Sequence, residues 1–154
     1  MRGIIGMAVA AFLIAGGVAQ AQPVREKIII DTDIGDDIDD AFAVALALSS
    51  PEFDVLGLSA DFGDTAARAR MLDRMLGEMG HSDIPVAMGV SVDVNRNAFT
   101  QRLYAEGGAF ARASHPNSVD FVLDQAHKYP GQVTLVAIGP LVNVGAMIDR
   151  KSVV

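Results

Sequence analysis

The stretch IIIDTDIGDDIDDAFAVALAL (residues 28–48) decides the fold, because it joins a strand pattern to a helix pattern through a run of acids. Its isoleucines are β-branched and apolar, which is typical of a strand buried on both faces of a sheet. Six of the ten residues in DTDIGDDIDD are aspartates. Residues 39–49 predict a helix, because acids at its start favour the positive end of the helix dipole. The stretch therefore predicts one strand–loop–helix unit.

The rest of the chain repeats this alternation. Strands are predicted at residues 27–30, 55–60, 84–88 and 133–138, and helices at 39–49, 65–79, 118–128 and from about 141. Residues 91–113 have weak periodicity and are predicted to form a loop with a short helix. In the second helix the apolar residues share one face, and Arg68, Arg70 and Arg74 fall mostly on the other. The pattern predicts an α/β fold, a Rossmann-like open and mainly parallel sheet with helices on both faces.

The N-terminus carries the pattern of a secretory signal peptide. A basic start precedes the apolar run GIIGMAVAAFLIAGGV, and Ala19-Gln20-Ala21 matches an A-x-A cleavage site. The apolar run is short for a membrane span. We therefore expect residues 1–21 to be removed, a secreted or periplasmic location, and a single α/β domain at residues 22–154 with no stable span.

Composition excludes several classes of function. The formal net charge of −7 argues against a nucleic acid polymer as partner, because phosphate binding needs a basic surface. The chain has no cysteine, so disulfides and thiolate metal sites are excluded.

Three polar clusters follow predicted strands, at residues 31–40, 61–65 and 139–143. In open parallel sheets, ligands bind at the carboxyl ends of the strands. Crowded carboxylates must take up protons or find a cation, and oxygen ligands suit Ca²⁺ or Mg²⁺. The strand-end pair Asp31 and Asp33 and the helix-start pair Asp39 and Asp40 can therefore line one crevice.

Alternatives remain for single aspartates. Asp39 or Asp40 can be a helix N-cap, and Asp36 is the best candidate for a solvated loop charge. An EF-hand is disfavoured, because the acids follow a strand and no glutamate closes a twelve-residue loop. The three histidines, His81, His115 and His127, are expected to be surface or structural residues.

The motifs together resemble the inosine-uridine preferring nucleoside hydrolase family. The DTDxG…DDA stretch resembles its signature, and DFGDT, IPVAMG and VTLVAIGPLVN resemble its later segments in the same order. The resemblance covers nearly all of residues 27–150. It implies the N-terminal half of the nucleoside hydrolase fold and a calcium-dependent enzyme that cleaves the N-glycosidic bond of ribonucleosides to ribose and free base.

The family's site residues carry over by position. The resemblance implies that Asp33 binds Ca²⁺ and acts as general base, that Asp40 is a bidentate metal ligand, and that Asp39 holds a ribose hydroxyl. Val142 matches the position whose backbone carbonyl binds the metal. Asp64 matches an asparagine that contacts the ribose. Beside these, Asn143 is a candidate for substrate contact or merely a residue at a helix start.

Three departures from the family pattern matter. Two residues are added before the final acidic pair, so Asp36 and Asp37 compete for the roles of Asp39 and Asp40, and Asp37 is a further candidate ligand. Aspartate replaces asparagine at position 64. The chain is also about half the family's length, so we expect a C-terminally incomplete domain that lacks the leaving-group acid. The longer form is expected to be a homo-oligomer that acts on a small nucleoside.

Two other functions compete with the hydrolase. The chain can be a non-catalytic remnant that retains calcium or ribose affinity. It can also be a haloacid-dehalogenase-type phosphatase, because Asp31-Thr32-Asp33 has the spacing of that class. An open half-sheet is further expected to be marginally stable or to aggregate.

Overall fold

The computed structural model describes residues 24–92 and 100–151. The predicted signal peptide therefore lies outside the described residues. The elements follow in the order β1 (Glu26–Thr32), α1 (Asp39–Ser49), β2 (Phe53–Ala60), α2 (Thr65–Glu78), β3 (Val86–Met88), α3 (Arg102–Glu106), α4 (Ser118–Lys128), β4 (Val133–Ala137) and α5 (Val142–Lys151).

The four strands form one parallel sheet in the order β3-β2-β1-β4. β1 lies inside the sheet, with Ile30 opposite Leu58 of β2 on one side and Val136 of β4 on the other. Helical connections return the chain to the same end of the sheet after each strand, as parallel pairing requires. The predicted open parallel sheet is confirmed.

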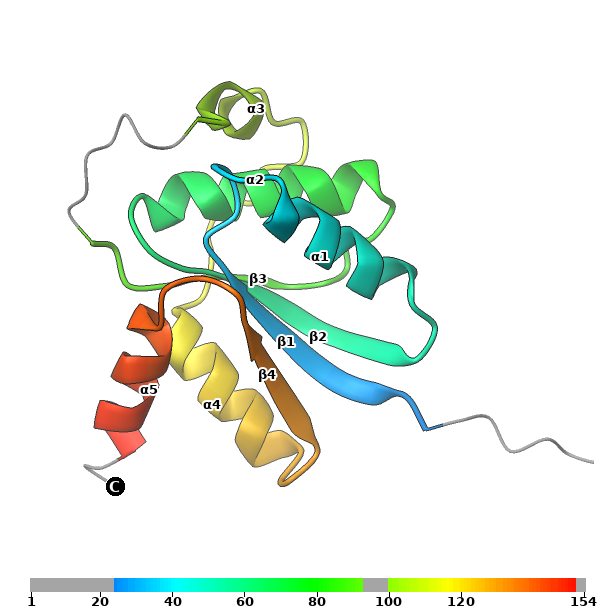
Figure 1. Cartoon of the computed structure of the whole chain (residues 1–154), viewed down its shortest axis with the longest axis vertical. Helices are drawn as coiled ribbons and strands as arrows, with labels where there is room; N and C mark the ends of the chain where they lie inside the picture. Colours follow the sequence, from blue (N-terminus) through cyan, green and yellow to red (C-terminus); the bar gives the residue numbers. More distant parts are fainter. Residues whose placement is uncertain (1–23, 93–99, 152–154) are drawn as a thin grey trace, which may run out of the picture.

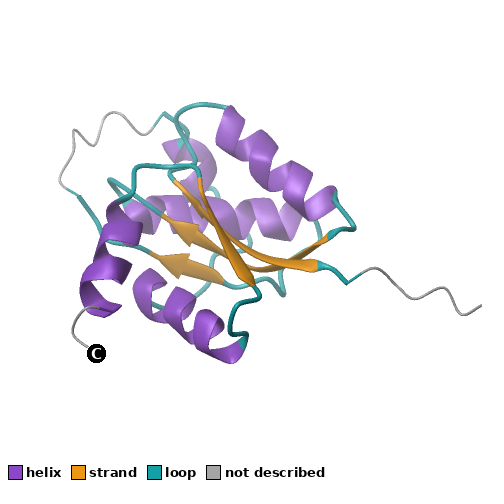
Figure 2. Cartoon of the chain, turned by 60° about the horizontal axis from the view of Figure 1, so that its bottom comes forward, coloured by secondary structure: helices purple, strands orange, loops and turns teal. Residues whose placement is uncertain are grey.

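Helices cover both faces of this sheet, as predicted. α1 and α2 lie on one face, and α4 and α5 lie on the other (Figures 1 and 2). Side chains of β1 pack alternately into the hydrophobic cores on the two faces of the sheet, because successive side chains of a strand point to opposite faces. Ile28 and Ile30 pack with the α1 and α2 layer, whereas Ile29 packs with α4 and α5.

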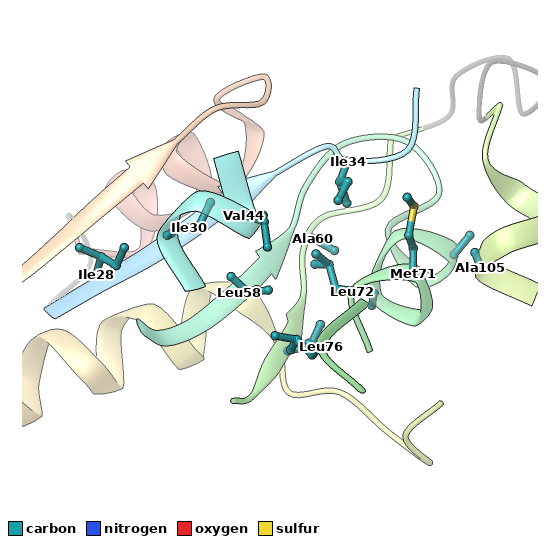
Figure 3. Close-up of a cluster of buried hydrophobic side chains, with 14 residues drawn as sticks. Ile28, Ile30, Ile34, Val44, Leu58, Ala60, Met71, Leu72, Leu76 and Ala105 are labelled. Carbon is teal, nitrogen blue, oxygen red and sulfur yellow. The ribbon is translucent and has the colours of Figure 1, made fainter. Parts of the chain in front are cut away.

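The larger core lies between α1, α2 and the sheet. Val44 of α1, Leu58 of β2 and Leu72 and Leu76 of α2 are fully buried there. Figure 3 shows these side chains together with Ile34, which comes from the acidic loop and reaches into the same cluster. The loop that carries the aspartates is therefore anchored in the core through one apolar side chain.

Element bounds agree closely with the sequence prediction. α1 and α4 begin and end where predicted, and the short helix expected within residues 91–113 is α3. β3 begins at Val86, two residues later than predicted, because Pro85 has no N–H to donate to a strand ladder. In the part of the chain that the structure describes, no helix is long and apolar enough to cross a membrane.

Two local predictions were wrong. Arg68 does not lie on the polar face of α2, since its residue is only 4% exposed. Asp36 is not a solvated loop charge, because it forms an ion pair with Arg68 at 2.9 Å. The N-cap alternative for Asp39 and Asp40 also fails, because Ile38 is the N-cap residue of α1.

Candidate active site

Asp33 lies against the connection between β4 and α5, and Asp40 lies in the first turn of α1. Residues 33–38, which we call the aspartate loop, connect the end of β1 to α1. Asp33 touches the turn after β4: a Cβ atom built on Gly139 would lie 2.9 Å from Asp33 Oδ1. Glycine at position 139 therefore lets the backbone that leads to Val142 approach this carboxylate.

Thr32 orients the second of these carboxylates. Its hydroxyl donates a hydrogen bond of 2.7 Å to Asp40 Oδ1, and its Oγ1 accepts one of 3.1 Å from the backbone N–H of Ile34. Asp40 is buried in the first turn of α1. One threonine thus couples the end of β1, the aspartate loop and the start of α1.

The site holds negative charge that the protein compensates only partly. Burial raises the pKa of Asp33, while Arg68 opposes the shift and Asp36 and Asp39 add to it. Burial also raises the pKa of Asp40, against the hydrogen bond from Thr32 and with a further rise from Asp33 and Asp39. These carboxylates repel one another in a partly desolvated place, which favours binding of a cation or a proton.

A second pair of aspartates, Asp31 near the end of β1 and Asp61 directly after β2, is fully buried. Asp31 Oδ1 accepts a hydrogen bond of 2.8 Å from Asn143 Nδ2, whereas Asp31 Oδ2 and both oxygens of Asp61 have no hydrogen-bond partner. Burial and the charge of Asp31 raise the pKa of Asp61 to about 7. Burial likewise raises the pKa of Asp31, against hydrogen bonds from Ser59 and Asn143.

Asn143 ties the elements around this pair together. Its side chain is fully buried and donates to Asp31 Oδ1, to Ser59 Oγ at 3.2 Å and to the carbonyl of Ala60 at 3.2 Å. Its Oδ1 accepts a hydrogen bond of 2.9 Å from the N–H of Val90. The amide therefore connects α5 to β1, to β2 and to the segment after β3.

The remaining predicted residues lie around this centre. Asp37 is exposed on the aspartate loop, and Asp39 is exposed in the first turn of α1. Asp64 caps α2 by accepting from the N–H of Ala67 at 3.1 Å, and it pairs with Arg102 at 3.0 Å. Burial acts to raise the pKa of Asp64, but these contacts with Ala67 and Arg102 outweigh it and the pKa is lowered.

Sequence reasoning gave no role to three residues that organise the site, Thr32, Asp61 and Arg68, although Asp61 begins the predicted polar cluster at residues 61–65. An aspartate at the end of the apolar run VLGLSA was a usable signal for Asp61, because a charge there must be buried by the sheet. Nothing local distinguishes Arg68 from its neighbours Arg70 and Arg74, since all three lie on one helix.

The donor set suits a hard cation. Carboxylate and carbonyl oxygens are the ligands of Ca²⁺ and Mg²⁺, and the unpartnered oxygens of Asp31 and Asp61 mark the same edge of the sheet as short of positive charge. Within residues 24–92 and 100–151, no three Asp, Glu or His side chains already converge on one point as a metal site. The carboxylates of Asp33 and Asp40 are acidic groups of this site with raised pKa values that could contribute to binding a cation.

The residues of this site lie within a segment that matches a known protein family. The family model described as inosine-uridine preferring nucleoside hydrolase matches residues 28–153. This match includes the aspartate loop and the turn that leads into α5.

Curated relatives agree with this match. A probable uridine nucleosidase 2 of Arabidopsis thaliana is 36% identical over 138 residues, which are 81% of this chain and 42% of that protein. The pyrimidine-specific ribonucleoside hydrolase RihA of Salmonella arizonae is 33% identical over 133 residues, 79% of this chain and 42% of that protein. The chain thus spans about two fifths of the length of the curated relatives it matches.

Solved structures share the fold. A plant nucleoside hydrolase superposes with a TM-score of 0.67 at 30% identity, over 81% of this chain and 43% of that one. A purine-preferring ribonucleoside hydrolase from Gardnerella vaginalis gives a TM-score of 0.68 at 24% identity, over 81% and 44% of the two chains. The second likeness concerns the fold alone.

Proposed function

The chain belongs to the inosine-uridine preferring nucleoside hydrolase family, and on this premise we propose that it supplies the carboxylate side of a site that hydrolyses the N-glycosidic bond of ribonucleosides. The products are ribose and the free base. The observation that carries the proposal is the position of Asp33, directly after β1, against the turn at Gly139 and near enough to the buried Asp40 of α1 to raise the pKa of that carboxyl. Family membership also removes the phosphatase alternative.

We propose calcium as the cation of this site. The carboxylates of Asp33 and Asp40 and the carbonyl of Val142 are the proposed ligands, with Asp37 as a further candidate. The raised pKa values of Asp33 and Asp40 support this assignment, because burial and mutual repulsion penalise their charged forms until positive charge arrives. When bound, calcium supplies Lewis acidity, which favours deprotonation of water and attracts the hydroxyls of ribose.

Each acidic side chain then has a distinct task. Asp33 accepts a proton from the attacking water, as a carboxylate held beside that water can. Asp39, exposed at the start of α1, accepts a hydrogen bond from a ribose hydroxyl. The surrounding carboxylates stabilise the positive charge that develops on the sugar.

Two residues on the sugar side have partners in the protein. Asp64 is proposed to contact the ribose, and this contact competes with its ion pair to Arg102. All hydrogen-bonding atoms of the Asn143 amide are engaged by the protein, so we assign to Asn143 the support of Asp31 rather than a direct bond to substrate. Protonation of the departing base is assigned to a group outside this chain.

Uridine is the first substrate to test. Relatives carry the names uridine nucleosidase and pyrimidine-specific ribonucleoside hydrolase, and we propose a small ribonucleoside of that kind here. We further propose that the protein is secreted, because residues 1–21 have the pattern of a signal peptide. Homo-oligomer formation is a second proposal.

Calcium titration by calorimetry tests the proposal. We expect the chain to bind calcium and the double variant Asp33→Asn, Asp40→Asn to bind at least about tenfold more weakly, because both lost charges are proposed ligands. Asp124→Asn is the matched control, since Asp124 is exposed on α4 on the other face of the sheet. Release of ribose from uridine, with calcium or with a chelator, is measured on the same samples.

The outcomes separate two functions. Calcium binding with release of ribose supports hydrolysis by the chain itself. Calcium binding without turnover supports the alternative of a non-catalytic chain that retains calcium affinity. A folded chain that binds no calcium would overturn the metal assignment.

A further inference from the structure

A buried arginine on α2 holds the aspartate loop from behind. Arg68 lies in the first turn of α2, and its residue is only 4% exposed. Removing a guanidinium from water costs several kcal/mol unless its donors are satisfied. The burial of Arg68 is therefore tolerated only because its donors form hydrogen bonds within the protein.

The guanidinium connects the loop after β1 to the turn after β2. Nη1 donates to the backbone carbonyls of Asp33 and Ile34, the second at 2.7 Å. Nη2 donates to Asp36 Oδ2 at 2.9 Å. Arg68 thus contacts three residues of the aspartate loop, and two of the acceptors are backbone atoms. It therefore constrains the course of the backbone as well as the local charge.

The fourth contact braces a strained residue. Nε of Arg68 donates to the carbonyl of Phe62 at 3.0 Å. Phe62 has φ 59°, in the left-handed region that a residue with a Cβ adopts only at a cost of roughly 1 kcal/mol or more. This hydrogen bond holds the turn after β2 against α2. The turn leads directly into α2, so its conformation also sets the position of Arg68 relative to the aspartate loop.

The loop is held from its other side as well. The N–H of Thr100 donates to Asp36 Oδ1 at 3.0 Å, and the N–H of Gln101 donates to the carbonyl of Gly35 at 3.0 Å. Asp36 therefore uses one oxygen for Arg68 and the other for Thr100. The carboxylate of Asp36 therefore stabilises the conformation of the loop.

We propose that Arg68 is the positioning residue of the site, which holds the aspartate loop in the conformation that aims Asp33 and Asp40 at a common ligand. It does so by gripping the carbonyls of Asp33 and Ile34 and by neutralising Asp36, so that six acids in ten residues do not force the loop open. The effect on calcium affinity rests on the proposed function, whereas the ordering of the loop does not.

Two measurements on the whole chain test this assignment. Hydrogen exchange reports loop order without any metal, since the N–H of Ile34 bonds to Thr32 Oγ1 in the native loop. Calcium titration, under conditions in which every variant is folded, reports the site. The variants are Arg68→Met and Arg68→Lys, with Arg70→Met as a control of equal charge change on the same helix.

We expect Arg68→Met to speed exchange in residues 33–38 by about tenfold or more and to weaken calcium binding by a similar factor, with exchange in β2 unchanged. Arg68→Lys should fall between, because an ammonium cannot span the same acceptors. Arg70→Met should stay within about twofold of the parent chain in both measurements. If Arg68→Met fails to fold, the lysine variant carries the comparison.

Each other result counts against one proposal and not the other. Unchanged loop exchange in Arg68→Met, or in Arg68→Lys if only that variant folds, overturns the positioning role. A lower melting temperature with unchanged calcium affinity of the folded variant also overturns it, because that marks a purely structural residue. A parent chain that binds no calcium, but whose loop exchange responds to Arg68, retains the positioning role and overturns the metal assignment.

Discussion

At the scale of single residues, Asp61 is the least compensated group of the site. Its side chain is fully buried after β2, neither carboxylate oxygen makes a full hydrogen bond, and the backbone N–H groups of Phe62 and Asn143 only partly oppose the rise in its pKa. Burial and the nearby Asp31 raise its pKa to about 7 from the ordinary 3.8. In the absence of a cation, the folded chain therefore favours a proton on this carboxyl.

This shift makes stability depend on pH. Between pH 3.8 and about 7 the folded chain holds a proton on Asp61 that the unfolded chain releases, so stability falls as pH rises through that window. Asp61→Asn removes the charge at nearly constant shape. We expect the variant to be more stable than the parent chain at pH 8 by about 2–4 kcal/mol, and the two to converge near pH 4.

Urea unfolding with a chelator present, at several pH values, measures this difference, and Asp124→Asn serves as the control. A stability difference that is the same at pH 4 and pH 8 would show that Asp61 does not titrate between the folded and unfolded states as described.

At the scale of elements, α2 organises the irregular chain around it. Arg68 in its first turn donates hydrogen bonds to the aspartate loop. Asp73 in its middle bonds to the segment that precedes α4. Asp73 is buried, and its Oδ2 accepts from the N–H of Arg112 at 2.9 Å and pairs with His115 Nε2 at 2.8 Å. The guanidinium of Arg112 lies 3.4 Å from Asp73 Oδ1. One helix thus orders two segments that have no regular structure.

Loss of this anchor should be costly. Asp73→Ala removes a buried carboxylate and leaves the N–H of Arg112 and the His115 ring without this partner, and we expect the free energy of unfolding to fall by about 2–4 kcal/mol. Thermal and urea unfolding measure the loss. Asp83→Ala is the control, because Asp83 is exposed in the loop after α2, and equal stability of the two variants would argue against an anchoring role for Asp73.

At the scale of the whole molecule, the sheet presents an open edge and an apolar groove. β4 is an edge strand. Beside it, a groove of about 360 Å³ between α1 and the sheet is lined by apolar side chains that include Ile28, Ile30 and Val136. Leu46 and Ile138 of the same groove are 68% and 38% exposed. Such a surface next to unpaired backbone groups favours association with other chains.

We therefore expect the chain to self-associate at micromolar concentration, and Leu46→Lys to increase the monomer fraction without lowering the melting temperature. The reason is that Leu46 is mostly exposed, so its removal uncovers no core. Light scattering after size exclusion measures the monomer fraction, and Leu103→Lys is the control, because Leu103 is 85% exposed on α3. A monodisperse parent chain with a sharp cooperative thermal transition in the absence of calcium contradicts this expectation.

The sequence by itself determined the elements, the parallel sheet and the place of the acidic motif. Apolar periodicity is a local property of the backbone, so α1 and α4 were predicted to the residue, and strand–helix alternation allows few sheets other than an open parallel one. The likeness of the aspartate motif to a nucleoside hydrolase signature was equally visible in the chain.

Only the tertiary structure decided which charges are buried and what they meet. Arg68, Arg70 and Arg74 lie on one helix, yet of the three only Arg68 is buried and bonds to the aspartate loop, because packing against the sheet brings the first turn of α2 to that loop. Asp36 and Arg68 are 32 residues apart in sequence, and Asn143 and Asp31 are 112 apart. The energy of a charge depends on its burial and its nearest partners, and those are set by which distant segments pack together.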